Sequence, residues 1–170
     1  MRLLLISDTH LPVRAKELQP QVWRLVDEAE LVIHAGDWVD EATLDALAGR
    51  ASRLVGVAGN NDGPELWERL GEVARVEVEG VRIAVIHETG AAAGRERRCD
   101  ERFGPDSDEP VDVLVFGHSH IPWDSTTPGG LRLLNPGSLA DRRCQPVGTV
   151  MTVDIRDARI QSVMVVPTPR

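Results

Sequence analysis

Seven side chains able to bind a metal ion occur in five short blocks along the sequence, and each block follows an apolar run. They are Asp8, His10, Asp37, Asn60, His87, His118 and His120. The set holds imidazole, carboxylate and carboxamide groups without a thiolate, so it suits Mn²⁺, Fe, Zn²⁺ or Ni²⁺ and fits a structural zinc site poorly. One such block alone is more often turn chemistry than a ligand. Five blocks in this context together predict one metal site.

The apolar runs that precede these blocks are short and rich in β-branched residues, which is typical of strands. They cover residues 3–6, 31–33, 54–58, 81–86 and 111–116, and further strands are expected at 73–78, 131–135, 149–155 and 158–166. Helical patterns separate the first three runs: an apolar face over residues 18–26, a segment with Asp40 as N-cap and Gly49 at its end, and a short helix from Pro64. Because ligands of α/β sheets bind beyond the carboxyl ends of strands, these ends can converge on one crevice.

This element order predicts the fold class α/β. Alternating strands and helices in the first half favour parallel pairing with right-handed crossovers, whereas Glu79-Gly80 predicts a hairpin in the second half. We expect two facing mixed sheets flanked by helices, a four-layer α-β-β-α sandwich. A chain of 170 residues can bury a substantial core, and we expect residues 1–170 to form one domain.

Two local expectations concern the blocks themselves. Asp8 and His10, like His118 and His120, stand two residues apart, and in extended backbone such pairs point to one side. The glycines before Asp37, Asn60 and His118 are expected to let the backbone turn tightly. Each block would then present its donors to the crevice.

Composition and net charge limit the classes of molecule that the protein is expected to bind. The net charge is −8 and aromatic residues make up 4% with no Tyr, so we expect no stable nucleic-acid complex. No apolar run is long enough for a membrane span or a signal peptide, so we expect no membrane partner and a cytoplasmic location. Cys99 and Cys144 are isolated and suggest neither a disulfide nor a thiolate site. Homo-oligomerisation stays open.

The five blocks as a set resemble the signature of the calcineurin-like metallophosphoesterases. Together with the loop Asn135-Pro136-Gly137-Ser138, the chain is similar to their small bacterial and archaeal phosphodiesterase branch. This resemblance implies the same four-layer sandwich and a dinuclear metal centre. It assigns one ion to Asp8, His10, Asp37 and His120, and a second to Asp37, Asn60, His87 and His118, with Asp37 bridging.

The activity that the resemblance implies is phosphoester hydrolysis with two divalent transition metal ions, and we expect manganese first. Two ions about 3.5–4 Å apart can hold a bridging hydroxide for in-line attack on phosphorus. Their charge would let an acidic protein bind a small phosphate-ester substrate, most simply a phosphodiester. A phosphomonoesterase or a hydrolase of nucleotide anhydrides is the alternative enzyme. The alternative of another class is a non-catalytic protein-interaction module like the retromer subunit of this fold.

That retromer subunit has lost ligands, with Asn in place of Asp37 and Asp in place of Asn60. Here every metal-binding position carries a competent ligand, which favours an enzyme.

The candidate catalytic residues are Asn61 and Asp62. Many family members have His at the position of Asn61, where it contacts the phosphate and helps the leaving group. A carboxamide donates a neutral hydrogen bond but cannot deliver a proton, which favours diesters with good leaving groups. Asp62 is expected to orient its neighbours. Glu88 and Thr89 depart from the family pattern, which usually has Gly directly after His87, and Glu88 adds a negative charge near the site.

Other features close to the blocks have structural interpretations. Arg95, Arg97 and Arg98 form a basic cluster that is typical of a solvated helix face, with substrate binding as the lesser alternative. His34 is interpreted as structural or as support for the ligands. Trp38 and Trp123 could wall a pocket but are as often core residues.

Overall fold

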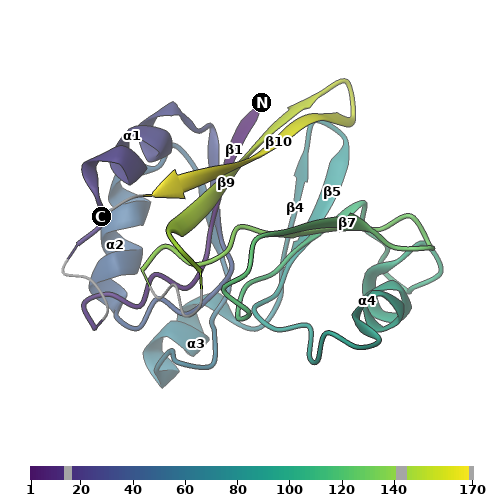
Figure 1. Ribbon diagram of the computed structural model, residues 1–170, viewed down its shortest axis with the longest axis horizontal. Helices are drawn as coiled ribbons and strands as arrows, with labels where there is room; N and C mark the ends of the chain where they lie inside the picture. The colour runs from purple at the N-terminus through teal and green to yellow at the C-terminus, as the bar shows by residue number, and fades with distance from the viewer. Residues whose placement is uncertain (14–16, 141–144, 169–170) are drawn as a thin grey trace.

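Two five-stranded sheets face each other in the computed structural model, which describes residues 1–13, 17–140 and 145–168 (Figure 1). In the first sheet the order is β10-β9-β1-β2-β3, with β1 (Arg2–Ile6), β2 (Leu31–His34), β3 (Leu54–Gly56), β9 (Gly148–Arg156) and β10 (Arg159–Thr168). In the second the order is β4-β5-β6-β8-β7, with β4 (Ala74–Val78), β5 (Val81–Val85), β6 (Val113–Val115), β7 (Trp123–Thr126) and β8 (Arg132–Asn135).

Both sheets are mixed. Strands β1, β2 and β3 run parallel, as do β5, β6 and β8, while β9 and β10 in the first sheet and β4 and β7 in the second make antiparallel pairs. Parallel neighbours end at the same edge of a sheet, so the loops after β1, β2 and β3 start side by side. The loops after β5 and β6 start together in the same way.

Alternating side chains of the strands build three apolar layers. Leu3 and Leu5 point into the layer between the two sheets, whereas Leu4 and Ile6 pack with side chains of α1 (Pro20–Glu28) and α2 (Glu41–Arg50). Phe103 of α4 (Arg95–Phe103) packs on the outer face of the second sheet. The short α3 (Pro64–Leu70) adds Leu66 to the layer under the first sheet. The predicted four-layer α-β-β-α sandwich is confirmed.

Several local predictions are confirmed as well. The Asp40 side chain accepts a hydrogen bond from the Thr43 backbone at 2.9 Å and begins α2 as its N-cap. Glu79 and Gly80 both have positive φ and join β4 to β5 as a hairpin. The prediction that Gly49 ends α2 is wrong, because the helix continues through Arg50.

The sequence did not predict β7, and it indicated α4 only through the basic cluster of Arg95, Arg97 and Arg98. Helix α4 buries only Cys99 and Phe103 among otherwise polar residues, so its apolar stripe is too narrow to recognise. Strand β7 is an edge strand of four mostly exposed residues, which leaves no alternating pattern. Among the described residues, no helix has the length and apolar character that a membrane span requires.

Candidate metal centre

The loops after five strands bring all seven predicted ligands into one continuous network of contacts. The loops after β1, β2, β3, β5 and β6 each contribute at least one of them. Neighbouring side chains in this network lie 2.9–3.8 Å apart, in the order His120, Asp8, His10, Asp37, His87, Asn60 and His118. The sequence therefore predicted which residues meet, although they are up to 112 positions apart (from Asp8 to His120).

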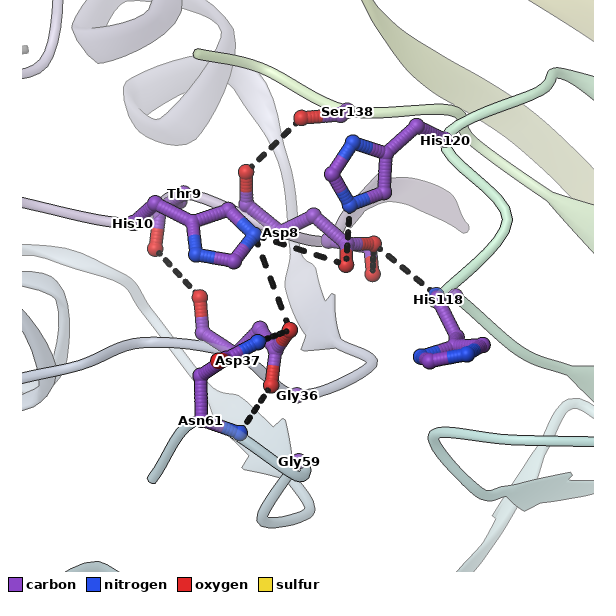
Figure 2. Close-up of polar contacts among 12 residues, drawn as sticks. Asp8, Thr9, His10, Gly36, Asp37, Gly59, Asn61, His118, His120 and Ser138 are labelled. Carbon is purple, nitrogen blue, oxygen red and sulfur yellow. Dashed lines mark hydrogen bonds and ion pairs between the residues drawn. The ribbon is translucent and has the colours of Figure 1, made fainter. Parts of the chain in front are cut away.

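The first group consists of Asp8, His10 and His120, and all three are buried. Asp8 Oδ1 lies 3.1 Å from His120 Nε2 and 3.8 Å from His10 Nε2 (Figure 2). Burial raises the pKa of the Asp8 carboxyl, but contacts with His10 and His120 outweigh it and hold that pKa below its ordinary value. The carboxylate is therefore charged and ready to bind a cation.

The two oxygens of Asp8 have different surroundings. Oδ2 accepts hydrogen bonds from the Ser7 hydroxyl and, at 3.1 Å, from the His118 backbone N–H. Oδ1 is buried and accepts no hydrogen bond from the described residues, and buried His10 Nε2 likewise has no hydrogen-bond partner there. Buried polar atoms without partners are costly. A cation bound between these two atoms would satisfy both, so the first group fits a metal ion.

Asp37 lies between the first group and the second. Its Oδ2 is 3.6 Å from His10 Nε2, and its Oδ1 is 3.4 Å from His87 Nε2. Burial raises the pKa of Asp37, yet His87 and the hydrogen bonds from Asn61 lower it below its ordinary value. One charged carboxylate thus presents one oxygen to each group, which is the arrangement expected of a bridging ligand.

The second group consists of Asn60, His87 and His118. The Asn60 side-chain oxygen lies 3.0 Å from His87 Nε2 and 2.9 Å from His118 Nδ1. His87 is buried, whereas His118 keeps about a third of its side chain exposed. This group therefore forms the more open side of the site.

The hydrogen bonds of His87 also fit a metal ion. His87 Nδ1 lies 2.7 Å from the Ala35 carbonyl, so Nδ1 carries the proton and donates it. In the neutral ring, Nε2 then carries a lone pair, and it faces the oxygens of Asn60 and Asp37. Metal-binding histidines commonly donate their other N–H to a backbone carbonyl in this way. Burial lowers the pKa of His87, but Asp37 and Asp8 raise it above its ordinary value, so a positive charge is favoured here.

The expectation of extended backbone in the two His-containing blocks is wrong. Asp8, His10, Asp37, His118 and His120 all have left-handed backbone, with φ between 47° and 66°. The two histidines of the last block consequently separate, His120 to Asp8 and His118 to Asn60. Left-handed non-glycine residues each cost on the order of 1 kcal/mol and concentrate at functional sites. Five of the seven predicted ligands carry this strain, which supports a functional role.

Of the three glycines that precede ligands, Gly36 has the expected role and the other two have a different one. Gly36 has φ of 89° and needs to be glycine for its turn. Gly59 and Gly117 do not have left-handed backbone. A Cβ at Gly59 would overlap Asp37, and one at Gly117 would overlap the Ser7 hydroxyl and approach the Ala35 carbonyl within 2.9 Å. These two glycines permit close approach between loops.

Asn61 and Asp62 both contact the turn that carries Asp37. The Asn61 side-chain amide donates to Asp37 Oδ2 at 2.6 Å, and its backbone N–H donates to Asp37 Oδ1 at 2.9 Å (Figure 2). The buried Asp62 carboxylate accepts from the backbone N–H groups of Asp37, Gly59 and Val39 at 2.7–3.0 Å. Burial raises the pKa of Asp62 above its ordinary value despite these bonds. Asp62 orients its neighbours, as predicted, and Asn61 positions Asp37.

The buried His34 side chain contacts both the loop after β1 and the loop after β2. Its Nδ1 accepts from the Gly36 N–H at 3.2 Å, so Nε2 carries the proton and faces the Thr9 hydroxyl at 3.3 Å. The ring is fully buried and stacks on Trp38, with centroids 3.5 Å apart. Trp38 is therefore a core residue. His34 supports the ligand loops, as its position at a strand end indicated.

The buried neutral ring of His34 predicts that acid destabilises the protein. Burial lowers the pKa of His34 from 6.5 to about 3. Below pH 6.5 the unfolded chain binds a proton that the folded chain refuses, so stability falls as pH falls from 6.5 toward 3, by up to about 1.4 kcal/mol per pH unit. Urea unfolding of the metal-free protein between pH 7 and 4.5 measures this slope. We expect a flatter slope in His34→Gln than in the parent; equal slopes would contradict the prediction.

Two residues of the loop after β8 also support the ligand loops. The Asn135 amide donates to the Gly117 carbonyl at 2.9 Å, and the Ser138 hydroxyl donates to the Asp8 carbonyl at 2.9 Å (Figure 2). Both side chains are buried. The sequence singled out residues 135–138 only through the family resemblance, and it did not reveal which backbone groups they hold.

The basic cluster of α4 does not face the ligands as a unit. Arg97 is exposed and pairs with Glu101, and Arg95 lies over the rings of Phe116 and Trp123. Arg98 donates to the carbonyls of the loop after β5, at residues 89, 91 and 93. This loop carries Glu88, whose Oε1 lies 3.8 Å from His118 Nε2. The predicted extra negative charge is thus beside the second group.

The chain belongs to the calcineurin-like phosphoesterase superfamily, whose domain model matches residues 1–158. A probable metallophosphoesterase of Methanocaldococcus jannaschii is 35% identical over 152 residues, which cover 89% of this chain and 74% of that protein. A Thermotoga maritima protein with a solution structure is 33% identical, with a TM-score of 0.75, and the match covers 98% of this chain and 99% of that one. The predicted family is confirmed.

Two more distant structures share the fold. Vps29 of Entamoeba histolytica, solved in complex with Zn²⁺, is 22% identical with a TM-score of 0.72 over 99% of this chain and 98% of its own. An archaeal phosphodiesterase is 18% identical with a TM-score of 0.68 over 98% of this chain and 100% of its own. These likenesses establish the fold alone.

Proposed function

We propose that this protein is a dinuclear metal-dependent phosphodiesterase. The observation that carries the proposal is the position of Asp37, whose two oxygens face a histidine of each ligand group at 3.6 and 3.4 Å. Asp8, His10 and His120 would hold one ion with Asp37, and Asn60, His87 and His118 would hold the other. When bound, the two ions would supply an activated water and neutralise the phosphate charge. Manganese is our first expectation.

The protein's own residues would set the geometry of the reaction. Asn61 fixes Asp37 through two hydrogen bonds and lies exposed at the rim. Its amide offers a second N–H that can donate to a phosphate oxygen, but it has no proton to give to a leaving group. The reaction then depends on leaving groups that depart as anions. Glu88, beside His118, would repel the second negative charge of a monoester, so a diester is favoured.

The fold does not decide between an enzyme and an interaction module. It is shared by the archaeal phosphodiesterase and by Vps29. Because a structure of Vps29 was solved with Zn²⁺, metal binding alone cannot separate the two functions. The ligand set of this chain favours the enzyme, since Asp8, His10, His120 and Asp37 are buried donors on strained backbone and the second group adds the buried His87.

Turnover of paired substrates tests the proposal. The chelated protein would be assayed with bis(p-nitrophenyl) phosphate and with p-nitrophenyl phosphate, before and after Mn²⁺ is restored. We expect activity only with metal, and a kcat/KM for the diester at least roughly tenfold above that of the monoester, equivalent to about 1.4 kcal/mol. A preference for the monoester would favour the phosphomonoesterase alternative. A metal-loaded protein inert to both esters would favour the interaction module.

A further inference from the structure

A cavity of about 290 Å³ opens directly beside the second ligand group. Asn60 and His87 form part of its wall and belong to the candidate metal centre as well. The other side chains that give it chemical character are Trp67, Glu72 and Glu88. A phosphate held at the metal centre would therefore place one of its substituents at the mouth of this cavity.

The lining of the cavity combines an aromatic face with negative charge. Trp67 lies near the end of α3 with 40% of its surface exposed. Glu72 follows that helix and pairs with Arg102 at 2.8 Å, so its charge is largely offset. Among the described residues, the ion-pair partner of the Glu88 carboxylate is His118, at 3.8 Å. The His118 ring would be neutral as a metal ligand, so it would not offset the charge of Glu88. The cavity lining contains no Lys or Arg.

The loop that carries Glu88 is held in place by Arg98. The Arg98 guanidinium donates to the carbonyls of Thr89 at 3.1 Å and Ala93 at 2.8 Å, and it also contacts that of Ala91. Gly90 of this loop lines the cavity with φ of 75°. The loop is thus fixed by three backbone contacts, so Glu88 projects from a defined support.

We propose that this cavity binds an ammonium-bearing substituent of the substrate, between the face of Trp67 and the carboxylate of Glu88. The inference rests on the proposed function and names its substrate class, a phosphodiester with one cationic substituent. A cation over a tryptophan face is attracted by the ring, and the nearby carboxylate adds to that attraction. A neutral alkyl group of the same shape gains only the apolar contact.

A pair of isosteric substrates tests the charge directly. One is p-nitrophenyl phosphocholine and the other is 3,3-dimethylbutyl p-nitrophenyl phosphate, which has carbon in place of the quaternary nitrogen. In both, water adds to phosphorus and p-nitrophenolate leaves. We expect kcat/KM for the choline ester to exceed that for its neutral isostere by roughly tenfold. Equal values, or a p-nitrophenyl thymidine phosphate preferred over both, would overturn the proposal.

Variants of the lining residues locate the effect. Trp67→Leu and Glu88→Gln should each reduce the choline preference, the ratio of kcat/KM for the choline ester to that for its neutral isostere, to roughly threefold or less. Trp123→Leu is the matched control, because Trp123 is 39% exposed, like Trp67, but does not line this cavity. An unchanged preference in both lining variants, or an equal loss in the control, would contradict the assignment.

A binding measurement separates this inference from the proposed function. Phosphocholine and 3,3-dimethylbutyl phosphate would be titrated into the Mn-free, Zn-loaded protein while the indole N–H signals are followed by NMR, with Trp67 assigned from its Leu variant. We expect the Trp67 signal to shift with phosphocholine at a roughly tenfold lower concentration. If no diester is hydrolysed, the proposed function fails and this titration still decides on the cavity; equal affinities would overturn it.

Discussion

Replacing Asp37 by Asn is expected to lower phosphodiester kcat/KM by roughly 10³-fold or more, because the variant loses the carboxylate that presents one oxygen to each ligand group. The amide offers a single oxygen and no charge. Its N–H₂ would also face the Asn61 side-chain amide or the Asn61 backbone N–H, both of which now donate to this carboxylate. One donor would lose its acceptor, and the turn would relax away from His10 and His87.

Metal content and activity should fall together in this variant. Metal analysis after gel filtration is expected to give about two ions per chain in the parent and fewer than about one in Asp37→Asn. Asp45→Asn is the matched control, because Asp45 is an exposed residue of α2 that pairs with Arg69 at 2.7 Å, away from the ligand groups. If Asp37→Asn kept two ions and parental kcat/KM, the bridging role of Asp37 would be refuted.

The convergence of the seven candidate ligands could be predicted from the sequence because it depends largely on one general rule. Parallel strands end at a common edge, so donors that follow β1, β2 and β3 start together, as do donors that follow β5 and β6, and the facing of the two sheets brings both sets to one site. The residue types then limited the range of metal ions that such a site would suit. The position of each residue just after a strand was sufficient for this prediction, which did not require the conformations of the loops.

The supporting contacts depend on geometry that the sequence does not carry. Left-handed backbone at Asp8 and His120 is stabilised by distant partners, such as the Ser138 hydroxyl on the Asp8 carbonyl. The cavity beside Asn60 requires the packing of α3 against the loop after β5, so Trp67 gave no signal in the sequence. Local patterns also cannot show that the Asn61 side chain is hydrogen-bonded to Asp37, because residues 37 and 61 come into contact only once β2 and β3 are paired.

Gly59 illustrates the same point, and replacing it with Ala is expected to destabilise the protein by about 2–3 kcal/mol. Its backbone conformation is open to any residue, so a turn requirement would predict almost no effect. The added methyl group would instead overlap Asp37 Oδ1 and the Asp37 backbone nitrogen. Asp37 cannot move freely, because Asp62 holds its N–H at 3.0 Å and also holds the Gly59 N–H at 2.7 Å. The strain would therefore spread through the turn that presents the Asp37 carboxylate.

The matched substitution Gly49→Ala should have the opposite effect. Gly49 lies inside α2 with no atom within 4 Å of an added Cβ, so Ala is expected to stabilise the helix by about 0.5–1 kcal/mol. Thermal and urea unfolding of both variants, without metal, measures the contrast, and metal analysis shows whether Gly59→Ala also loses ions. A Gly59→Ala protein with parental stability and metal content would mean that the β2 and β3 loops do not approach as closely as the contact between Gly59 and Asp37 requires. The close approach of the loops after β2 and β3 is thus the reason that Ala is expected to destabilise the protein at Gly59, whereas Ala at Gly49 is expected to stabilise it.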